Sequence, residues 1–363
     1  MSVKIGVPRA LMYHYYYPMW KSFFNELELE LILSPETNKK ILDQGVRIAV
    51  DDICLPFKVY YGHVLDLIGK VDYIFVPRFI SLGKYNYVCP KFMGLPDMLK
   101  ATIKDLPELI EPVIDLRKGF TPLRKIAMQI GKRFKKGFWE IERAYRKAVK
   151  VQSHFDTLQI EGNNPTEAIE KTLCKYHYIS SSLNRQYKIK HSQEIQDYIA
   201  ASKRTDYNQL KNSDGINREN SVKKLNITVL GHAYILNDNF ISMNIIKHLK
   251  ELGAEIKTVE MFDNNSLEDA AALQEKKVFW YFNRKVMGAA YNVLTKKDQL
   301  DGIVQVTAFG CGPDSLVKEL IDIRGKRSNV SILNINLDEH SGEAGLLTRL
   351  EAFVDLLERR KIL

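Results

Sequence analysis

Three of the four cysteines in this chain share a local sequence that suits binding of a metal or an iron–sulfur cluster. The motifs are Cys54-Leu55-Pro56, Cys89-Pro90 and Gly310-Cys311-Gly312-Pro313. A proline stands within two residues of each cysteine, and each motif lies at a predicted strand-to-helix junction or helix N-terminus. Backbone N–H groups and the helix dipole at such a position favour a thiolate and the negative charge of a cluster. Three thiolates would leave one iron of a four-iron cluster open to water or substrate.

Spacing alone leaves other roles for these cysteines open. Disulfides are not expected, because the chain is long enough to build a core without them and the cytosol is reducing. Metal ligation, catalysis and simple burial all remain. For Cys174, inside the helical stretch 172–176, a buried thiol is the favoured interpretation. The sequence contains no phosphate-binding loop, no dinucleotide glycine motif, no zinc ribbon and no ferredoxin-type run of cysteines.

A polar segment near the C-terminus supplies candidates for acid–base chemistry. His340 and Glu343 follow a predicted strand, with Asp338 and Glu339 beside them, and would provide acid–base groups near the cysteines. Alternatively, the segment 341–343 caps the last helix and places its acidic group at the positive end of the helix dipole. The residue types do not decide between these two roles.

Two further histidines are weaker candidates. His232 ends the first strand of the second α/β region and so faces the same ligand-binding edge as the cysteines. A hydrogen-bonded loop histidine is the favoured interpretation of His232, and a catalytic role is the alternative. His63 stands on a predicted helix among apolar residues, so we expect it to be packed in the core.

The elements that must position these residues begin with an α/β pattern in residues 1–115. Short apolar runs predict strands at residues 4–8, 29–34, 71–77 and 110–115. Helical periodicity predicts helices at residues 12–27, 38–45, 54–69 and 95–102, with Thr37 as the N-cap of the second. Cys89 is placed in the loop before the last of these helices. The alternation is typical of a doubly wound α/β domain.

The same pattern returns in residues 225–363. Strands are predicted at residues 225–231, 255–259, 300–309 and 330–337. Helices are predicted at residues 242–253, 266–296, 314–324 and 344–360. The C-terminal α/β domain therefore resembles the N-terminal one in layout. In both, cysteines fall after strands or at helix starts, where doubly wound sheets bind their ligands.

Between the two α/β domains, residues 116–224 form a basic helical segment that ends in a polar linker at residues 211–223. This segment carries 23 Lys and Arg against 11 Asp and Glu, a net charge of +12, whereas the whole chain carries +9. A solvated helical face is the favoured interpretation, and docking of an acidic partner or an anionic ligand is the main alternative. Nucleic acid is the least favoured partner, because no nucleic-acid-binding motif accompanies the charge.

Length and composition fit an ordinary globular protein. A chain of 363 residues, 45% hydrophobic and 27% charged, predicts two to three domains and excludes wholesale disorder, collagen and coiled coil. Its longest apolar runs, such as residues 71–79 and 303–309, fall short of the roughly 18 to 20 residues that a membrane helix needs. The N-terminus is a predicted strand with no signal-peptide pattern. We therefore expect a cytoplasmic protein that does not bind membranes.

Long sequence blocks in both α/β regions match the pattern of one family. In the N-terminal region the blocks are residues 4–11, 20–24, 51–58, 62–63 and 88–97. In the C-terminal region they are residues 309–315, 338–345 and 348–353. Through these blocks the chain resembles the acyl-CoA dehydratase activase-related proteins, relatives of the 2-hydroxyacyl-CoA dehydratase subunits and the double-cubane cluster proteins. No block covers the basic middle segment.

The resemblance implies two flavodoxin-like domains that face each other across a cleft and bind a [4Fe-4S] cluster through Cys54, Cys89 and Cys311. It also implies a low-potential electron acceptor or reductase, fed by an ATP-hydrolysing activator, with a small-molecule substrate at the open iron. Unlike larger relatives, the sequence carries no ATPase domain, and its cysteines are too few for a double-cubane cluster. The alternative function is a non-enzymatic electron carrier or maturation partner that docks another protein through its basic helices.

Overall fold

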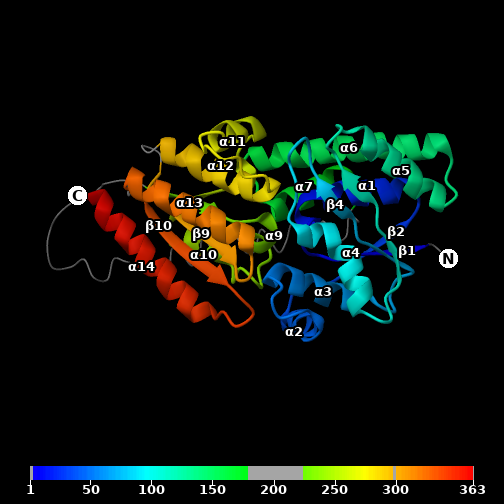
Figure 1. The fold of residues 1–363 in the computed structure, drawn as a ribbon, viewed down its shortest axis with the longest axis horizontal. Helices are drawn as coiled ribbons and strands as arrows, with labels where there is room; N and C mark the ends of the chain where they lie inside the picture. The colour runs from blue at the N-terminus through cyan, green and yellow to red at the C-terminus, as the bar shows by residue number, and fades with distance from the viewer. Residues whose placement is uncertain (1–2, 179–223, 297–299, 363) are drawn as a thin grey trace.

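The structure of the protein is a computed structural model that describes residues 3–178, 224–296 and 300–362 (Figure 1). The predicted α/β class is confirmed, because the described chain contains two four-stranded parallel sheets covered by helices. The N-terminal unit lies on the right of Figure 1 and the C-terminal unit on the left, with the chain ends at opposite ends of the long axis. The predicted linker at residues 211–223 lies outside the described residues.

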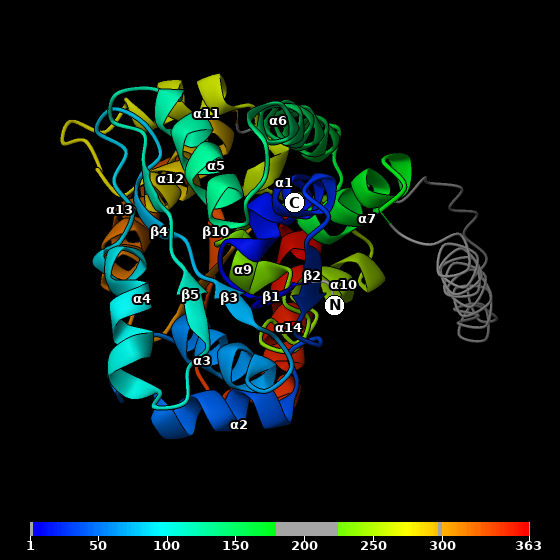
Figure 2. The same ribbon diagram turned by 90° about the vertical axis from the view of Figure 1, so that its right-hand side faces the viewer.

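The N-terminal sheet has the strand order β2-β1-β3-β5, so the chain reverses its winding direction at β1. Its strands are β1 (Lys4–Val7), β2 (Glu30–Leu33), β3 (Tyr73–Phe75) and β5 (Glu108–Ile110). Its helices are α1 (Tyr13–Glu26), α2 (Lys39–Ile48), α3 (Leu55–Leu67) and α4 (Pro90–Thr102). Helix α1 covers one face of the sheet, and α2 and α3 cover the other (Figures 1 and 2). Ile5, Val7 and Ile74 are fully buried, as expected of parallel strands between helical layers.

The described part of the basic middle segment packs on this unit. It forms α5 (Thr121–Arg133), α6 (Phe138–Ile160) and α7 (Pro165–Lys175), and α1 lies against both α6 and α7. Buried Ile141, Val151 and Phe155 face inward along α6. Helix α1 is therefore enclosed by the sheet and by other helices, and this explains why its aromatic residues occupy several sides. Among the described residues, no helix is both long and apolar enough to cross a membrane.

One predicted strand is wrong as a single element. The run 110–115 is split between β5, which pairs with β3, and β6 (Val113–Asp115), which pairs with β4 (Arg78–Ser81) in a separate two-stranded sheet. Pro112 stands between the two strands and cannot donate a ladder hydrogen bond, so the chain changes partner there. Strand β4 was not predicted, because a Pro77 break separates it from β3.

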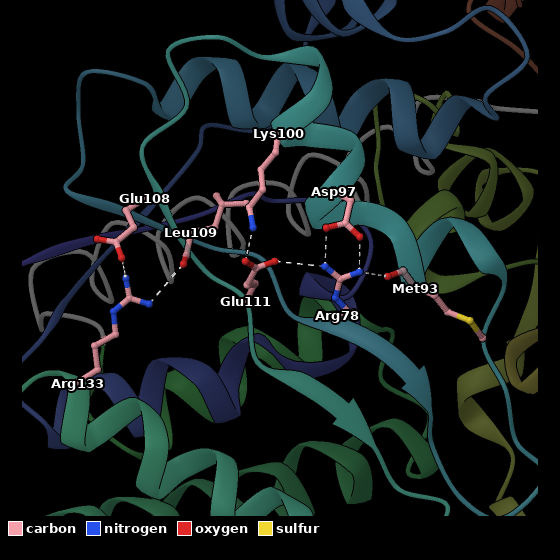
Figure 3. Close-up of polar contacts among 8 residues, drawn as sticks. All are labelled: Arg78, Met93, Asp97, Lys100, Glu108, Leu109, Glu111 and Arg133. Carbon is pink, nitrogen blue, oxygen red and sulfur yellow. Dashed lines mark hydrogen bonds and ion pairs between the residues drawn. The ribbon is translucent and has the colours of Figure 1, made fainter.

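A network of charged side chains fixes α4 against the edge of this unit (Figure 3). The Arg78 guanidinium donates to both carboxylate oxygens of Asp97, at 2.6 and 2.8 Å, and to the Met93 carbonyl at 2.8 Å. It also donates to Glu111, which accepts in turn from Lys100. The Met93 carbonyl and the Asp97 carboxylate of α4 thus both accept from the Arg78 side chain of β4. This network therefore holds the helix that begins directly after Cys89.

The C-terminal sheet has the order β10-β9-β7-β8, the same order as the first sheet when each is counted from its own first strand. Its strands are β7 (Leu225–Leu230), β8 (Ala254–Thr258), β9 (Gly302–Ala308) and β10 (Ser331–Leu337). Its helices are α9 (Ala233–Leu236), α10 (Ile245–Glu251), the 3-10 helix η2 (Val259–Met261), α11 (Asn264–Ala271), α12 (Tyr281–Thr295), α13 (Gly312–Ser328) and α14 (Glu343–Ile362). All neighbouring strands are parallel.

The single helix predicted over residues 266–296 is wrong, because two helices occupy that region. Helices α11 and α12 fold back against each other around Gly288, where a β-carbon would lie 2.3 Å from the Leu267 carbonyl oxygen. The segment 272–280 between them contains neither glycine nor proline, so no local signal marks the break. Tertiary packing determines the break, because α11 and α12 bury apolar side chains against each other.

The two units pack directly on each other. Tyr87 donates its N–H to the Phe279 carbonyl at 3.1 Å, and its own carbonyl accepts from the Tyr281 N–H at 2.7 Å. The rings of Tyr15 and Phe282 lie 4.8 Å apart across the same boundary. One cluster of buried apolar residues includes members of both sheets. The carboxyl ends of the two sheets are therefore held at a shared boundary.

Candidate functional site

Each of the three candidate cysteines stands immediately before a helix. Cys54 is the N-cap of α3, Cys89 of α4 and Cys311 of α13, each in an extended backbone conformation with a proline in the first turn that follows. The predicted helix-N-terminal placement is therefore confirmed. Cys89 lies outside the helix, as predicted, but the predicted helix start near residue 95 is wrong, because α4 begins at Pro90. The interior Pro96 obscured the first turn of that helix.

The fold brings these cysteines together although they belong to different units. The thiols of Cys54 and Cys311 share a hydrogen bond, and Cys89 lies close enough for the charge of Cys54 to affect it. Gly310 makes this approach feasible, because its φ is +74° and a β-carbon there would lie 3.3 Å from the Asp52 carbonyl oxygen. A helix N-terminus of the C-terminal unit thus meets two helix N-termini of the N-terminal unit.

The hydrogen bond between the Cys54 and Cys311 thiols shifts their pKa values in opposite directions. As the acceptor from Cys311, Cys54 has its pKa lowered to about 7, against the opposing effect of burial and with help from the Lys91 ammonium. Donation to Cys54 and burial raise the pKa of Cys311. Burial also raises the pKa of Cys89, although the backbone N–H groups of Phe92 and Lys91 oppose it. Of the two thiols, Cys54 is therefore the one that loses its proton more readily.

A buried histidine–carboxylate pair lies beside the cysteines. His232 Nε2 lies 2.8 Å from Oδ1 of Asp314, in the first turn of α13, and the same oxygen accepts from Asn283 at 2.6 Å. Burial alone would lower the pKa of His232, but Asp314 raises it overall. The His232 ring stacks on Tyr234 with centroids 4.9 Å apart. His232 is thus a hydrogen-bonded residue that faces the cysteine site through Asp314.

In the acidic loop after β10, Glu339 contacts the helix that begins directly after Cys54, whereas the two candidates His340 and Glu343 do not. Glu339 accepts from Lys58 of α3, whereas Glu343 lies 3.4 Å from His248 and His340 is exposed. Asp338 accepts from the backbone of His340 and the side chain of Ser341, which stabilises the turn before α14. The loop is therefore stabilised by its own turn and links the two units.

Two lysines next to the cysteines were not singled out from the sequence. Lys58 lies in the second turn of α3, and Lys91, in the first turn of α4, donates to the Gly310 carbonyl at 3.3 Å. A lysine near a helix N-terminus is disfavoured by the helix dipole, so its presence signals a nearby negative group. That signal was available in the motifs following Cys54 and Cys89.

Comparison with known proteins agrees with the sequence pattern. The sequence model of the family described as CoA enzyme activase uncharacterised domain (DUF2229) matches residues 4–262, more than half of the chain. The chain belongs to this family. No curated protein matches it. The matched range of this activase-family protein includes Cys54 and Cys89 and ends before Cys311.

A polar bridge further supports the inter-unit contact in this activase-family chain. Thr37 contacts Nε2 of His63 at 2.9 Å and donates to Asp238 of the C-terminal unit, and His63 Nδ1 lies 2.9 Å from Ser34. Burial raises the pKa of Asp238 to about 6, although Thr37 and two backbone N–H groups lower it in part. The prediction of Thr37 as an N-cap is wrong, because Asn38 accepts from Ile41 and caps α2.

The described side chains of this activase-family chain do not form a preassembled metal-binding group. Across residues 3–178, 224–296 and 300–362, no group of three or more His, Cys, Asp or Glu side chains is arranged to hold a metal ion. Cys174 lies on α7, which packs against α1 and α6. The roles of Cys54, Cys89 and Cys311 as ligands therefore stay a prediction.

Proposed function

We propose that this activase-family protein binds one [4Fe-4S] cluster through Cys54, Cys89 and Cys311 and accepts single electrons at low potential. The observation that carries the proposal is the hydrogen bond between the Cys54 and Cys311 thiols, which come from different sheets and different ends of the sequence. Few structural needs would bring two thiols from separate units to one point. Ligation of a shared group is such a need.

The surroundings of the three cysteines suit an anionic cluster held by thiolates. Three helix N-termini and Lys91 supply positive potential for an anionic cluster. The hydrogen bond from Cys311 lowers the pKa of the Cys54 thiol, and cluster binding would release the remaining thiol protons. When bound, the cluster would supply one-electron chemistry.

The residues around the cysteines would keep such a group dry and oriented. Lys58 and Glu339 close one side, and the buried His232–Asp314 pair closes another. His232 would hold a proton close to the site without direct access to solvent, since it is 3% exposed. We propose that electrons arrive from an ATP-hydrolysing activator that docks on the protein, and that a small-molecule substrate binds the iron without a cysteine.

A second candidate is a non-enzymatic electron carrier or maturation partner. The observation in its favour is that none of the three cysteines lines the cavity of about 460 Å³ that His232 borders. An enzyme needs substrate beside the open iron, whereas a carrier needs only a short path to the surface. A carrier would pass its electron to a protein acceptor and show no ligand-dependent change in its spectrum.

The cluster is tested by anaerobic purification, metal analysis and electron paramagnetic resonance. We expect a brown protein with about four irons per chain and a signal after reduction. Cys54→Ala, Cys89→Ala and Cys311→Ala should each lose most of the iron, and Cys174→Ala is the matched control that should retain it. A protein that stays free of iron after reconstitution would refute the proposal.

A further inference from the structure

The cavity of about 460 Å³ is built along one face of α6. Its lining includes residues 145, 149, 152, 156 and 159–160 of this helix, which recur at helical spacing. From residue 145 to residue 160 this face extends roughly 22 Å at about 1.5 Å per residue. The volume lies within the range of about 300 to 1,000 Å³ that is usual for small-molecule sites. Its shape is therefore that of an elongated slot.

One end of the slot is apolar. Trp20 of α1, Phe79 of β4, and Leu116 and Leu123 on either side of the α5 N-terminus line it, and all except Leu123 are at most 7% exposed. This end is formed by the N-terminal unit and the middle helices alone. Such a lining favours a hydrocarbon chain or ring and offers it no hydrogen bond.

The other end of the slot is polar and lies at the boundary with the C-terminal unit. Lys285 of α12 lies there, with its ammonium 4.7 Å from the centroid of the Tyr281 ring. Its charge acts on both Asp156 and Glu260, which places the three groups together. Among the described residues, Lys285 forms no ion pair within 4.0 Å. Its charge is therefore available to a ligand.

Unpartnered polar atoms converge on the same end. Within the part of the chain that the structure describes, Gln159 Nε2, Glu260 Oε2 and His232 Nδ1 are buried and lack a hydrogen-bond partner. His232 and Gln159 are only 3% and 6% exposed. Buried polar groups without partners are costly, and a cluster of them on one cavity indicates a polar ligand group. Burial raises the pKa of Glu260 and so favours its neutral form, which lessens its competition with an anionic ligand.

We propose that this slot binds a monocarboxylic acid with an unbranched apolar chain, with the carboxylate at Lys285 and Gln159 and the chain directed toward Phe79. The lysine provides charge, the Gln159 amide provides a hydrogen bond, and the apolar end accepts the chain. An amine would meet the Lys285 ammonium, and a neutral alcohol would leave that charge without a partner. The inference goes beyond the proposed function, because binding of the acid requires no cluster.

The test is isothermal titration of the full-length protein with decanoate, decylamine and decanol at matched concentrations. We expect decanoate to bind about tenfold or more tightly than the other two. Lys285→Met should weaken decanoate binding about tenfold or more and abolish the preference for the acid. Lys247→Met, on α10 outside the slot, is the matched control and should change nothing.

A second pair of variants separates binding from misfolding. Val149→Trp should fill the slot and weaken decanoate binding about tenfold or more, because Val149 lines it and is 43% exposed, so the larger side chain is tolerated. Leu356→Trp, on α14 and 48% exposed, is the control that should bind normally.

The same titrations with Cys54→Ala should give unchanged decanoate affinity, which distinguishes this inference from the cluster proposal. Equal or tighter binding of decylamine would overturn the inference. So would decanoate binding that is absent from the parent protein, or that survives both Lys285→Met and Val149→Trp.

Discussion

The ammonium of Lys58 lies 2.5 Å from Oε1 of Glu339 and joins α3 to the loop that follows β10. The Lys58 side chain is 7% exposed and that of Glu339 is 18% exposed. Burial alone would raise the pKa of Glu339, but Lys58 lowers it overall. Because α3 begins at Cys54, this ion pair holds the cysteine-bearing helix of one unit against the other unit.

Removal of one partner of this pair should destabilise the protein. We expect Glu339→Gln to lower the free energy of unfolding by about 2 to 4 kcal/mol, because it leaves the Lys58 ammonium buried without its counter-ion. The double variant Lys58→Met/Glu339→Gln should lose less than the sum of the two single variants. Urea denaturation at pH 7 measures both. Lys39→Met, which removes an exposed pair with Asp43, should cost less than about 1 kcal/mol, and an equal cost would contradict the argument.

Substitution of Gly310 should disturb the approach of Cys311 to Cys54. We expect Gly310→Ala to cost about 1 to 3 kcal/mol, because φ is +74° and the added β-carbon meets the Asp52 carbonyl at 3.3 Å. Gly312→Ala is the matched control, since a β-carbon there has no heavy atom within 4 Å. Thermal unfolding compares the two variants, and equal melting temperatures would show that the contact is not needed.

His14 should make the protein sensitive to acid. Burial lowers its pKa to about 3, and neither ring nitrogen has a hydrogen-bond partner among the described residues. Below about pH 6.5 the unfolded chain binds a proton that folded His14 does not, so stability falls by up to about 1.4 kcal/mol per pH unit from this group. Urea denaturation at pH 7 and pH 5 should show a smaller loss for His14→Phe. Exposed His340→Gln should behave like the parent.

The Arg78 network should control the order of α4. Arg78→Lys keeps the charge but loses the two-pronged contact with Asp97 and the bond to the Met93 carbonyl. We expect a loss of about 1 to 2 kcal/mol and faster amide hydrogen exchange in Pro90–Thr102. Arg117→Lys, which alters an ion pair with Asp115 outside α4, should leave exchange in that helix unchanged. Unchanged exchange in Arg78→Lys would remove the network as the anchor of Cys89.

Local sequence was sufficient where a residue's role depends on its nearest neighbours. Proline after Cys54, Cys89 and Cys311 predicted helix N-termini, and all three are N-caps. The alternation of strands and helices also predicted the α/β class and most elements of both sheets. Local sequence was not sufficient where partners are distant. The pairing of Cys54 with Cys311 depends on packing between units, which only the resemblance to a family implied.

The errors have the same physical origin. Thr37 has the side chain of an N-cap, but contacts with His63 and Asp238 occupy it, and its neighbour Asn38 caps α2. Likewise Glu339, rather than Glu343, reaches the N-terminal unit, because the turn before α14 directs it toward Lys58. In both cases a tertiary contact selects one residue from several that are locally equivalent.

The shared strand order of the two sheets has a consequence for the origin of the cysteine site. Counted within its own sheet, β3 is the third strand and leads through β4 to the helix capped by Cys89, while β9 is the third strand and leads to the helix capped by Cys311. These two cysteines are therefore topological equivalents. Cys54 has no such equivalent, because the sequence has no cysteine between the second and third strands of the C-terminal sheet. Duplication of one ancestral half would thus have supplied two thiols by symmetry, and a single added cysteine would have completed the set.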